Sequence, residues 1–184
     1  MATVELDKTD RKILAILQED GRLTNQEVAE RVNLSPSPCL RRIKRLEQAG
    51  VIRQYVALLA PDKIGLGLLA YVNVRLEKHG ASQVIGGSRA GTAAIPSPRA
   101  DFSASVTHWP EVVACYAMTG EMDYLLHVLV RDLEAYGQFT MAVLLKMPGV
   151  KDVKSSLALE VVKDSTALPL DRMDDRSPPA GKKK

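Results

Sequence analysis

The sequence predicts an α+β fold in two parts, three short helices followed by a region of order β-α-β-β-α-β. In the first 50 residues, apolar side chains recur at helical spacing between capping and turn residues. Further along, segments in which apolar and polar residues alternate flank segments of helical spacing. The 184 residues suffice for two small domains. We expect a helical domain at 1–50, a linker strand and hinge at 51–66, a ferredoxin-like domain at 67–165 and a polar, disordered tail at 166–184.

The helices of the first part have clear start and stop signals. Asp7 can cap the first helix, and Gly21 is expected to end it. Thr24 and Glu27 fit a capping box, in which each side chain accepts a hydrogen bond from the other residue's backbone N–H. Asn33 can adopt the left-handed conformation that ends the second helix. A third helix follows almost at once, and this layout predicts a helix-turn-helix module.

The third helix is expected to open at Ser35 and Pro36 and to run to Ala49, where Gly50 closes it. Between residues 36 and 48 it carries four cations and one anion, so the positive charge of the chain is concentrated here. At about 100° per residue, its core stripe is expected to comprise Leu40, Ile43 and Leu46, flanked by Cys39. The opposite side is expected to present Ser37, Pro38, Arg41, Arg45 and Gln48.

A basic helix at the second place of a tight helical pair is typical of a recognition helix, which lies in the major groove of DNA. We expect Arg41, and next Arg45, to read base edges, because a guanidinium donates two hydrogen bonds to guanine. Arg42 and Lys44 lie on the shoulders and are expected to hold phosphates. The alternative is a solvated helix face. The candidate DNA-binding residues are Ser35, Ser37, Pro38, Arg41, Arg42, Lys44 and Arg45.

The second part alternates strand and helix patterns. The first strand pattern places Ala70, Val72, Val74 and Leu76 on one face. The residues at 80–98 lack periodicity and are rich in small residues and proline, which predicts a mobile insertion. A hairpin turn is expected at 120–123. The expected elements are a linker strand at 51–59, strands at 68–77, 112–119, 124–130 and 153–162, and helices at 99–109 and 132–147.

The residues give no sign of catalysis or of a metal site. The chain has no G-x-x-x-x-G-K-[ST] loop, no H-E-x-x-H motif and no C-x-x-C pair. We therefore expect no enzyme, no cofactor and no metal. Cys39 and Cys115 do not make a disulfide framework, and no apolar run reaches the roughly 20 residues of a membrane span. These observations predict a cytoplasmic protein without a membrane partner, and the expected DNA binding makes it nucleoid-associated.

Five stretches resemble the Lrp/AsnC (feast/famine) family of transcription regulators. The helix-turn-helix signature is matched at 32–47 and continues at 50–55. The match resumes at 110–113, at 119–126 and at 145–150, in the same order as in the family. It covers nearly the whole chain except the loop at 80–98, which is longer than the family's usual crossover, and the tail.

The resemblance implies a winged helix-turn-helix followed by a RAM (ACT-like) domain that senses amino acids. It implies partners as well: double-stranded DNA, further copies of the chain in dimers and in octamers or larger assemblies, and a small amino-acid effector, with leucine or another apolar amino acid as the first guess. Relatives bind the effector near the hairpin turn between the second and third strands. The positions implied here are Gly120, Glu121, Met122 and Asp123, with Leu133 and Ser156 as weaker candidates for the neighbouring wall.

The chemistry of this turn suits an amino acid, because backbone N–H groups can bind a carboxylate and Asp123 can pair with an α-ammonium. The alternative is an ordinary hairpin whose aspartate bonds its own backbone. The predicted function is a sequence-specific transcription regulator whose assembly responds to an amino acid. Two other functions stay open, a weakly specific architectural DNA-binding protein and a metabolite-sensing module that docks protein. Salt dependence and the specificity ratio distinguish the three.

Overall fold

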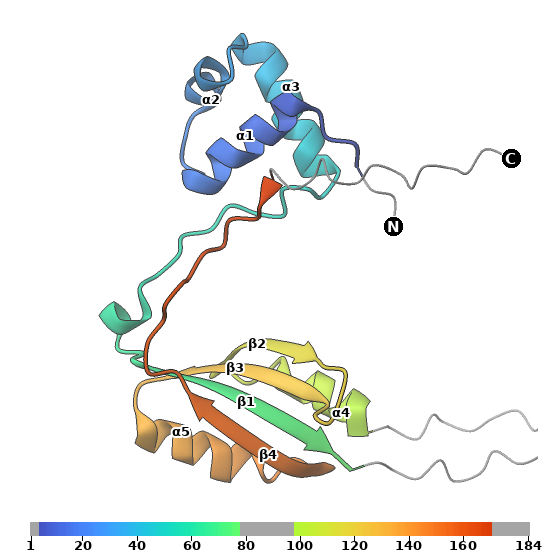
Figure 1. Cartoon of the computed structure of the whole chain (residues 1–184), viewed down its shortest axis with the longest axis vertical. Coiled ribbons are helices and arrows are strands. Elements are labelled where there is room, and N and C mark those ends of the chain that lie inside the picture. The colour runs from blue at the N-terminus through green and yellow to red at the C-terminus, as the bar shows by residue number, and fades with distance from the viewer. Residues whose placement is uncertain (1–3, 78–97, 171–184) are drawn as a thin grey trace, which may run out of the picture. The chain divides into compact units, whose positions relative to one another are not determined.

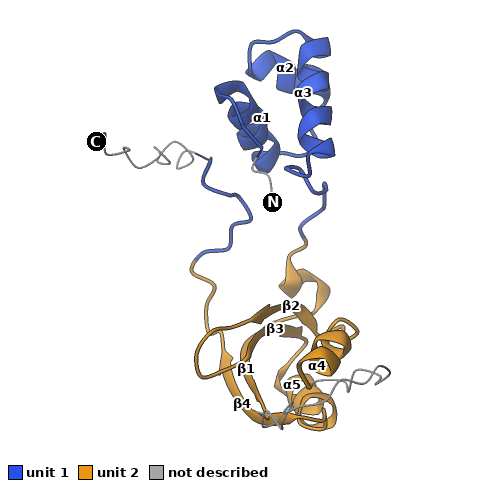
Figure 2. Cartoon of the chain, turned by 90° about the vertical axis from the view of Figure 1, so that its right-hand side faces the viewer, with its two compact units in different colours: residues 1–58, 163–184 blue, residues 59–162 orange. Residues whose placement is uncertain are grey.

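A computed structural model describes residues 4–77 and 98–170. The expected insertion at 80–98, apart from Pro98, and the tail beyond Leu170 lie outside the described residues. The chain divides into two compact units, one made of residues 1–58 and 163–184 and the other of residues 59–162 (Figure 2). Within the described residues, no helix is both long and apolar enough to cross a membrane.

The first unit contains three helices, α1 (Lys8–Glu19), α2 (Asn25–Arg31) and α3 (Pro36–Gln48) (Figure 1). Asp7 and Asp10 form a capping box at the start of α1, and Thr24 and Glu27 form the expected one at the start of α2. In both boxes, two backbone N–H groups without a helical partner gain an acceptor. Asn33, with φ of 56°, has the predicted left-handed conformation between α2 and α3.

The three helices enclose an apolar core with Cys39, Ile43 and Leu46 as the contribution of α3. The expectation that Leu40 belongs to this core is wrong, because its side chain is 40% exposed. Cys39, Ile43 and Leu46 follow the i, i+4, i+7 pattern of one narrow face, and Leu40 lies about 100° away from Cys39. The other buried residues of this core are Ile13, Leu14, Val28, Ala29 and Val32.

Two further expectations for these helices need correction. The helix α1 ends at Glu19 with Asp20 as its cap, and the backbone of Gly21 is not left-handed. Ser35 occupies the N-cap position of α3, but its side chain makes no capping hydrogen bond. Because Pro36 and Pro38, at the first and third helical positions, have no N–H, α3 begins with two orphan donors fewer than other helices.

The segment after α3 does not form the expected linker strand. Residues 53–60 have no regular structure, and a 3₁₀ turn, η1 (Pro61–Ile64), follows. No described strand forms a ladder with this segment. An extended sequence pattern alone is insufficient, because a strand is defined by the partner that pairs with its backbone groups.

The second unit has the predicted order, with β1 (Leu68–Leu76), α4 (Pro98–Val106), β2 (Val112–Ala117), β3 (Tyr124–Val130), α5 (Leu133–Phe139) and β4 (Val150–Leu157). A π-helical turn, Thr140–Leu144, extends α5. The four strands form one antiparallel sheet in the order β2-β3-β1-β4. Both helices cover the same face of this sheet (Figures 1 and 2).

The core of the second unit lies between the sheet and the helices. The predicted alternation in β1 is confirmed, since Ala70, Val72, Val74 and Leu76 are all buried. Leu126 and Val128 of β3 join them, whereas Leu125 and Leu129 lie on the other face. This second face is without a covering helix among the described elements, and the rings of Tyr71 and His127 stack on it 5.1 Å apart.

The ends of the elements differ from the predicted bounds. The strand β4 begins three residues earlier than expected and ends at Leu157, and Leu159 is fully exposed instead of facing the core. Beyond Leu157 the contact with β1 continues as the hydrogen bond from the Ala158 N–H to the Leu69 carbonyl, over 2.9 Å. The helix α4 ends at Val106 instead of residue 109, and β2 ends at Ala117 instead of residue 119.

Candidate nucleic-acid interface and ligand site

The four cations of α3 divide into two pairs with different surroundings. The side chains of Arg41 and Lys44 are exposed, and neither has a hydrogen bond or ion pair within the described part of the chain. Arg42 instead points back to α1, where its guanidinium lies 2.6 Å from the carboxylate of Asp7 and 2.9 Å from that of Asp10. Arg45 pairs with the other oxygen of Asp10.

The carboxylate of Asp10 is the centre of this arrangement. Its side chain is 1% exposed, while those of Arg42 and Arg45 are 31% and 51% exposed. Asp10 also accepts the backbone N–H of Asp7 over 3.1 Å. A buried carboxylate is costly unless it is paired and hydrogen-bonded, and here each oxygen meets a guanidinium.

The pKa values of the outer groups follow from these contacts. The pKa of Asp7 lies below its ordinary value, because its carboxylate accepts the backbone N–H of Asp10 and a hydrogen bond from Arg42. The pKa of Arg42 is raised by its hydrogen bonds to Asp7 and Asp10. Both shifts favour the charged forms, so the ion pair persists at neutral pH.

The predicted DNA-binding residues lie on one side of α3. Ser35 and Ser37 are exposed at the N-terminal end of the helix, and Pro38 is half-buried. The role of Asp7 and Asp10 was not predicted from the sequence, because no local signal links α1 to a helix more than 30 residues later. A surface hollow along the basic side is lined by Asp7, Ser37, Leu40, Arg41, Arg42, Lys44, Arg45 and Gln48.

The predicted ligand site is a turn at the end of the β2–β3 hairpin, as expected. Gly120 has φ of 112°, a conformation that side-chain-bearing residues rarely adopt. The backbone of Asp123 is fixed on both sides, since its N–H donates to the Val74 carbonyl over 2.9 Å and its carbonyl accepts from Met118 over 2.8 Å. Its carboxylate accepts the backbone N–H of Leu76 over 2.9 Å. Asp123 therefore joins the turn to β1.

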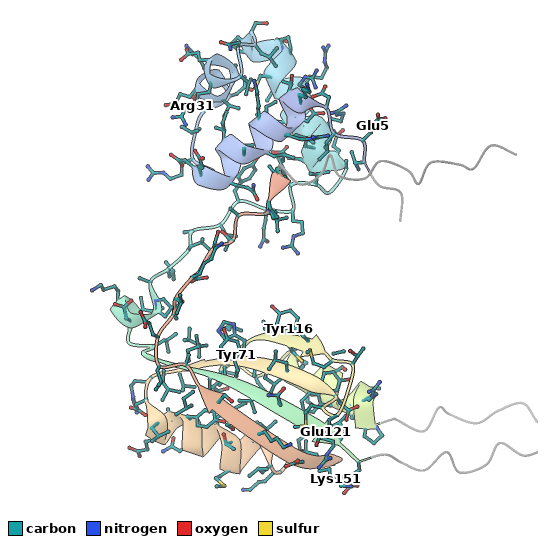
Figure 3. The ribbon with its side chains drawn as sticks, viewed as in Figure 1. Glu5, Arg31, Tyr71, Tyr116, Glu121 and Lys151 are labelled. Carbon is teal, nitrogen blue, oxygen red and sulfur yellow. The ribbon has the colours of Figure 1, made fainter. Side chains whose placement is uncertain are left out.

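Charged side chains from three elements surround this turn. Arg99, at the start of α4, lies 2.5 Å from the Asp123 carboxylate, and its pKa is raised by that hydrogen bond. Glu121 lies 3.4 Å from Lys154 of β4 and 3.6 Å from Arg75 of β1. Figure 3 shows Glu121 at this end of the sheet. No sequence pattern pointed to Arg99 or Arg75, because both reach the turn only through the fold of the second unit.

The chain itself does not bring all six predicted ligand residues together. Leu133 begins α5, which follows the end of β3 at Val130. The turn meets the other end of β3, at Tyr124, six register positions away. At about 3.4 Å per residue these ends lie about 20 Å apart. Ser156 pairs with Tyr71 in the middle of β1. Met122, by contrast, lies half-buried in the turn itself.

No catalytic constellation accompanies these two sites within the described residues. No group of three His, Cys, Asp or Glu side chains in residues 4–77 and 98–170 could hold a metal ion. Burial raises the pKa of both Cys39 and Cys115, which disfavours the reactive thiolate.

Comparisons with known proteins match both parts of the chain. A family model described as "Winged helix-turn-helix DNA-binding" matches residues 6–53, and one described as "Lrp/AsnC ligand binding domain" matches residues 94–168. The DNA-binding transcriptional activator DecR of Escherichia coli K12 is 42% identical over 90% of this chain and 99% of its own length. The leucine-responsive regulatory protein of Salmonella typhimurium is 39% identical over 89% of this chain and 91% of its own.

Solved structures give the same result. A transcriptional regulator from Neisseria meningitidis, determined as a complex with L-Met, is 49% identical with a TM-score of 0.80. The match covers 91% of this chain and 98% of that one. An AsnC family transcriptional regulator from Agrobacterium tumefaciens is 40% identical with a TM-score of 0.78, and the match covers 91% and 99% of the two chains.

Proposed function

Because the chain belongs to the Lrp/AsnC family of DNA-binding transcription regulators, we propose that α3 reads DNA sequence and that the hairpin turn at 120–123 binds the effector. The family consists of regulators and not of enzymes, and its second domain is a ligand-binding domain. The observation that carries the proposal is the exposed basic surface of α3, where Arg41 and Lys44 have no ion pair within the described residues, on a domain that matches a DNA-binding family.

The proposed DNA surface comprises Ser35, Ser37, Pro38, Arg41, Arg42, Lys44 and Arg45. Arg41 is the first candidate for base reading, because its guanidinium is exposed and can direct two donors to guanine. Lys44 is a flexible point charge suited to a phosphate. The small side chains of Ser35 and Ser37 allow the N-terminal end of α3 to approach base edges closely.

The proposed effector is a free amino acid, with an apolar side chain as in methionine or leucine. The Neisseria relative was determined as a complex with L-Met, which supports an amino acid of this kind. Asp123 offers a carboxylate to the α-ammonium, and Arg99 beside it offers a guanidinium to the α-carboxylate. Gly120, Glu121 and Met122 complete the turn. Because Leu133 and Ser156 lie away from it in one chain, we propose that they contribute only where a second chain brings them close.

The proposed partners are double-stranded DNA and further copies of the chain, as dimers and larger assemblies in the cytoplasm. The uncovered sheet face supports a dimer, because it presents Leu125, Leu129 and the stacked rings of Tyr71 and His127. Tyr71 stands on this face in Figure 3. Two copies would place two recognition helices on two half-sites of partly palindromic DNA.

A footprint on the DNA upstream of the protein's own gene tests the proposal, with and without L-methionine and L-leucine. We expect protection at the spacing of helical turns, about 10 base pairs, and a changed pattern when an amino acid is added. Protection that ignores both amino acids would contradict the proposed effector. An absence of protection at low salt, on this DNA and on sites selected from a random pool, would contradict the DNA surface.

A further inference from the structure

Asp10 of α1 holds two of the four cations that the recognition helix carries. One of its oxygens lies 2.9 Å from Arg42, the other pairs with Arg45, and Asp7 holds Arg42 from a second side at 2.6 Å. We infer that Asp10 is a positioning residue for DNA recognition, which fixes the Arg42 and Arg45 side chains and thereby raises sequence selectivity over non-specific attraction. The inference rests on the proposed DNA surface of α3.

The charge balance supports this role. Between residues 36 and 48, four cations and one anion leave an excess of three positive charges. Asp7 and Asp10 lie directly against two of these cations and reduce the excess at the surface to one. A protein selected only for phosphate attraction gains nothing from such compensation, since each neutralised phosphate adds to its affinity.

The geometry indicates what the carboxylate provides instead. A free arginine loses much rotamer freedom when it binds a base, and this loss reduces the affinity. Arg45 is already held on one side by Asp10, yet about half of its side chain is exposed. A guanidinium has five N–H donors, so those not directed to Asp10 remain for DNA. Arg42 is held by two carboxylates and is less exposed, so its direction is more restricted than that of Arg45.

The position of Asp10 also explains its burial. As the third residue of α1 it completes the capping box with Asp7, so its backbone is fixed by the helix start. Its side chain is 1% exposed, and each oxygen has at least one donor. A surface ion pair formed by chance would be mobile and solvated, whereas this carboxylate is held from its own helix and from α3.

The test compares full-length wild-type protein with the variants Asp10→Asn and Glu19→Gln. Glu19 is an exposed residue of the same helix and has no hydrogen bond or ion pair with α3 in the described part of the chain, so its substitution is the matched control for one lost negative charge. Binding is measured against salt on a mixed-sequence duplex of about 30 base pairs, three turns of about 10, and on a site of equal length selected from a random pool by the wild type.

We expect Asp10→Asn to bind the mixed-sequence duplex more tightly at low salt, with a slope of log affinity against log salt that is steeper by about 1–2. Up to two released arginines reach phosphates, and each phosphate contact adds about 0.9 to this slope. We expect the ratio of selected-site to mixed-sequence affinity to fall about tenfold, within the range of one bidentate arginine contact. Glu19→Gln should change neither quantity appreciably. Equal slopes and ratios in Asp10→Asn and the control would overturn the inference.

A second set of variants keeps the test valid if Asp10→Asn unfolds in part. In a background that carries Arg42→Gln and Arg45→Gln, Asp10→Asn should leave slope and ratio unchanged, because Asp10 acts through these two side chains. A loss of the same size in both backgrounds indicates a merely structural role and overturns the inference. If Arg41→Ala leaves binding to the selected site intact, the proposed DNA surface fails instead, whatever Asp10→Asn does.

Discussion

Asp123 allows the structural and the ligand-binding roles of one side chain to be separated. Its carboxylate accepts the backbone N–H of Leu76 over 2.9 Å and pairs with Arg99 at 2.5 Å. Leu76 is 3% exposed, so Asp123→Ala would leave a buried N–H without its acceptor, at a cost of about 1–3 kcal/mol. The pair with the exposed Arg99 is screened by solvent and adds little. We expect Asp123→Ala to lower the unfolding free energy by about 2 kcal/mol.

Asp123→Asn is the matched variant, because an amide oxygen can still accept from Leu76 while the negative charge is gone. Its loss of stability should stay below about 1 kcal/mol. Its affinity for L-methionine should nevertheless fall about tenfold or more, since a hydrogen bond to a charged group contributes about 1.5–3 kcal/mol. Urea unfolding measures the first quantity and calorimetric titration with L-methionine and L-leucine the second.

Two results would refute this reasoning. If the asparagine variant binds both amino acids as tightly as the wild type, the carboxylate does not contact the effector, and the turn at 120–123 is an ordinary hairpin. If the alanine variant is no less stable than the asparagine variant, the bond to the Leu76 N–H does not matter for the fold.

Three further predictions concern the helical unit. Arg41→Ala should weaken binding to a selected DNA site by about 1–3 kcal/mol, with a much smaller loss of affinity for mixed-sequence DNA. The control Arg22→Ala, at an exposed residue outside α3, should change both affinities little. Equal losses on both DNAs for Arg41→Ala would exclude Arg41 from base reading. The pKa of Asp7 is lowered in the folded chain, so the stability that its carboxylate contributes is present above the ordinary pKa of 3.8 and is lost as the pH falls through the folded pKa. Thermal unfolding between pH 5 and about 2 should therefore show a smaller acid-induced loss of stability for Asp7→Asn than for wild type. Equal losses of stability would contradict the ion pair. A chain that ends at residue 165 should be about 1–3 kcal/mol less stable than one that ends at Leu170. The reason is that Leu168 exchanges two hydrogen bonds with Gln18, at 2.6 and 3.3 Å, and Leu170 packs on the helical core. Equal melting temperatures of the two chains would refute this contact.

Local signals in the sequence predicted most of the elements. The capping box of Thr24 and Glu27, the left-handed Asn33 and the alternation in β1 depend on residues within one turn or one strand, and the structure confirms all three. The order of elements in the second unit is confirmed as well. Features that depend on a distant partner were predicted less well. The linker pattern at 51–59 is extended in sequence, but it has no described strand to pair with.

The candidate sites follow the same division. Helical spacing placed Arg41 opposite the core stripe of α3 and Lys44 on a shoulder, and both side chains are exposed, because that inference needs only the helix itself. It failed to predict that Arg42 and Arg45 are held from α1, since the pairing depends on how two helices pack. Leu133 was assigned to the ligand wall by resemblance alone, and one chain places it at the other end of β3.

The charge distribution of the helical unit also bears on the choice between a selective regulator and an architectural DNA-binding protein. An architectural protein that binds any sequence needs many phosphate contacts, and its affinity rises with each uncompensated cation. Here a buried carboxylate offsets two arginines of the very helix that would meet DNA. Burying Asp10 carries a desolvation cost that a solvated surface pair avoids. A cost of this kind is consistent with a helix whose arginines are held in fixed directions for base recognition, and it is unexpected if the helix only supplies positive charge.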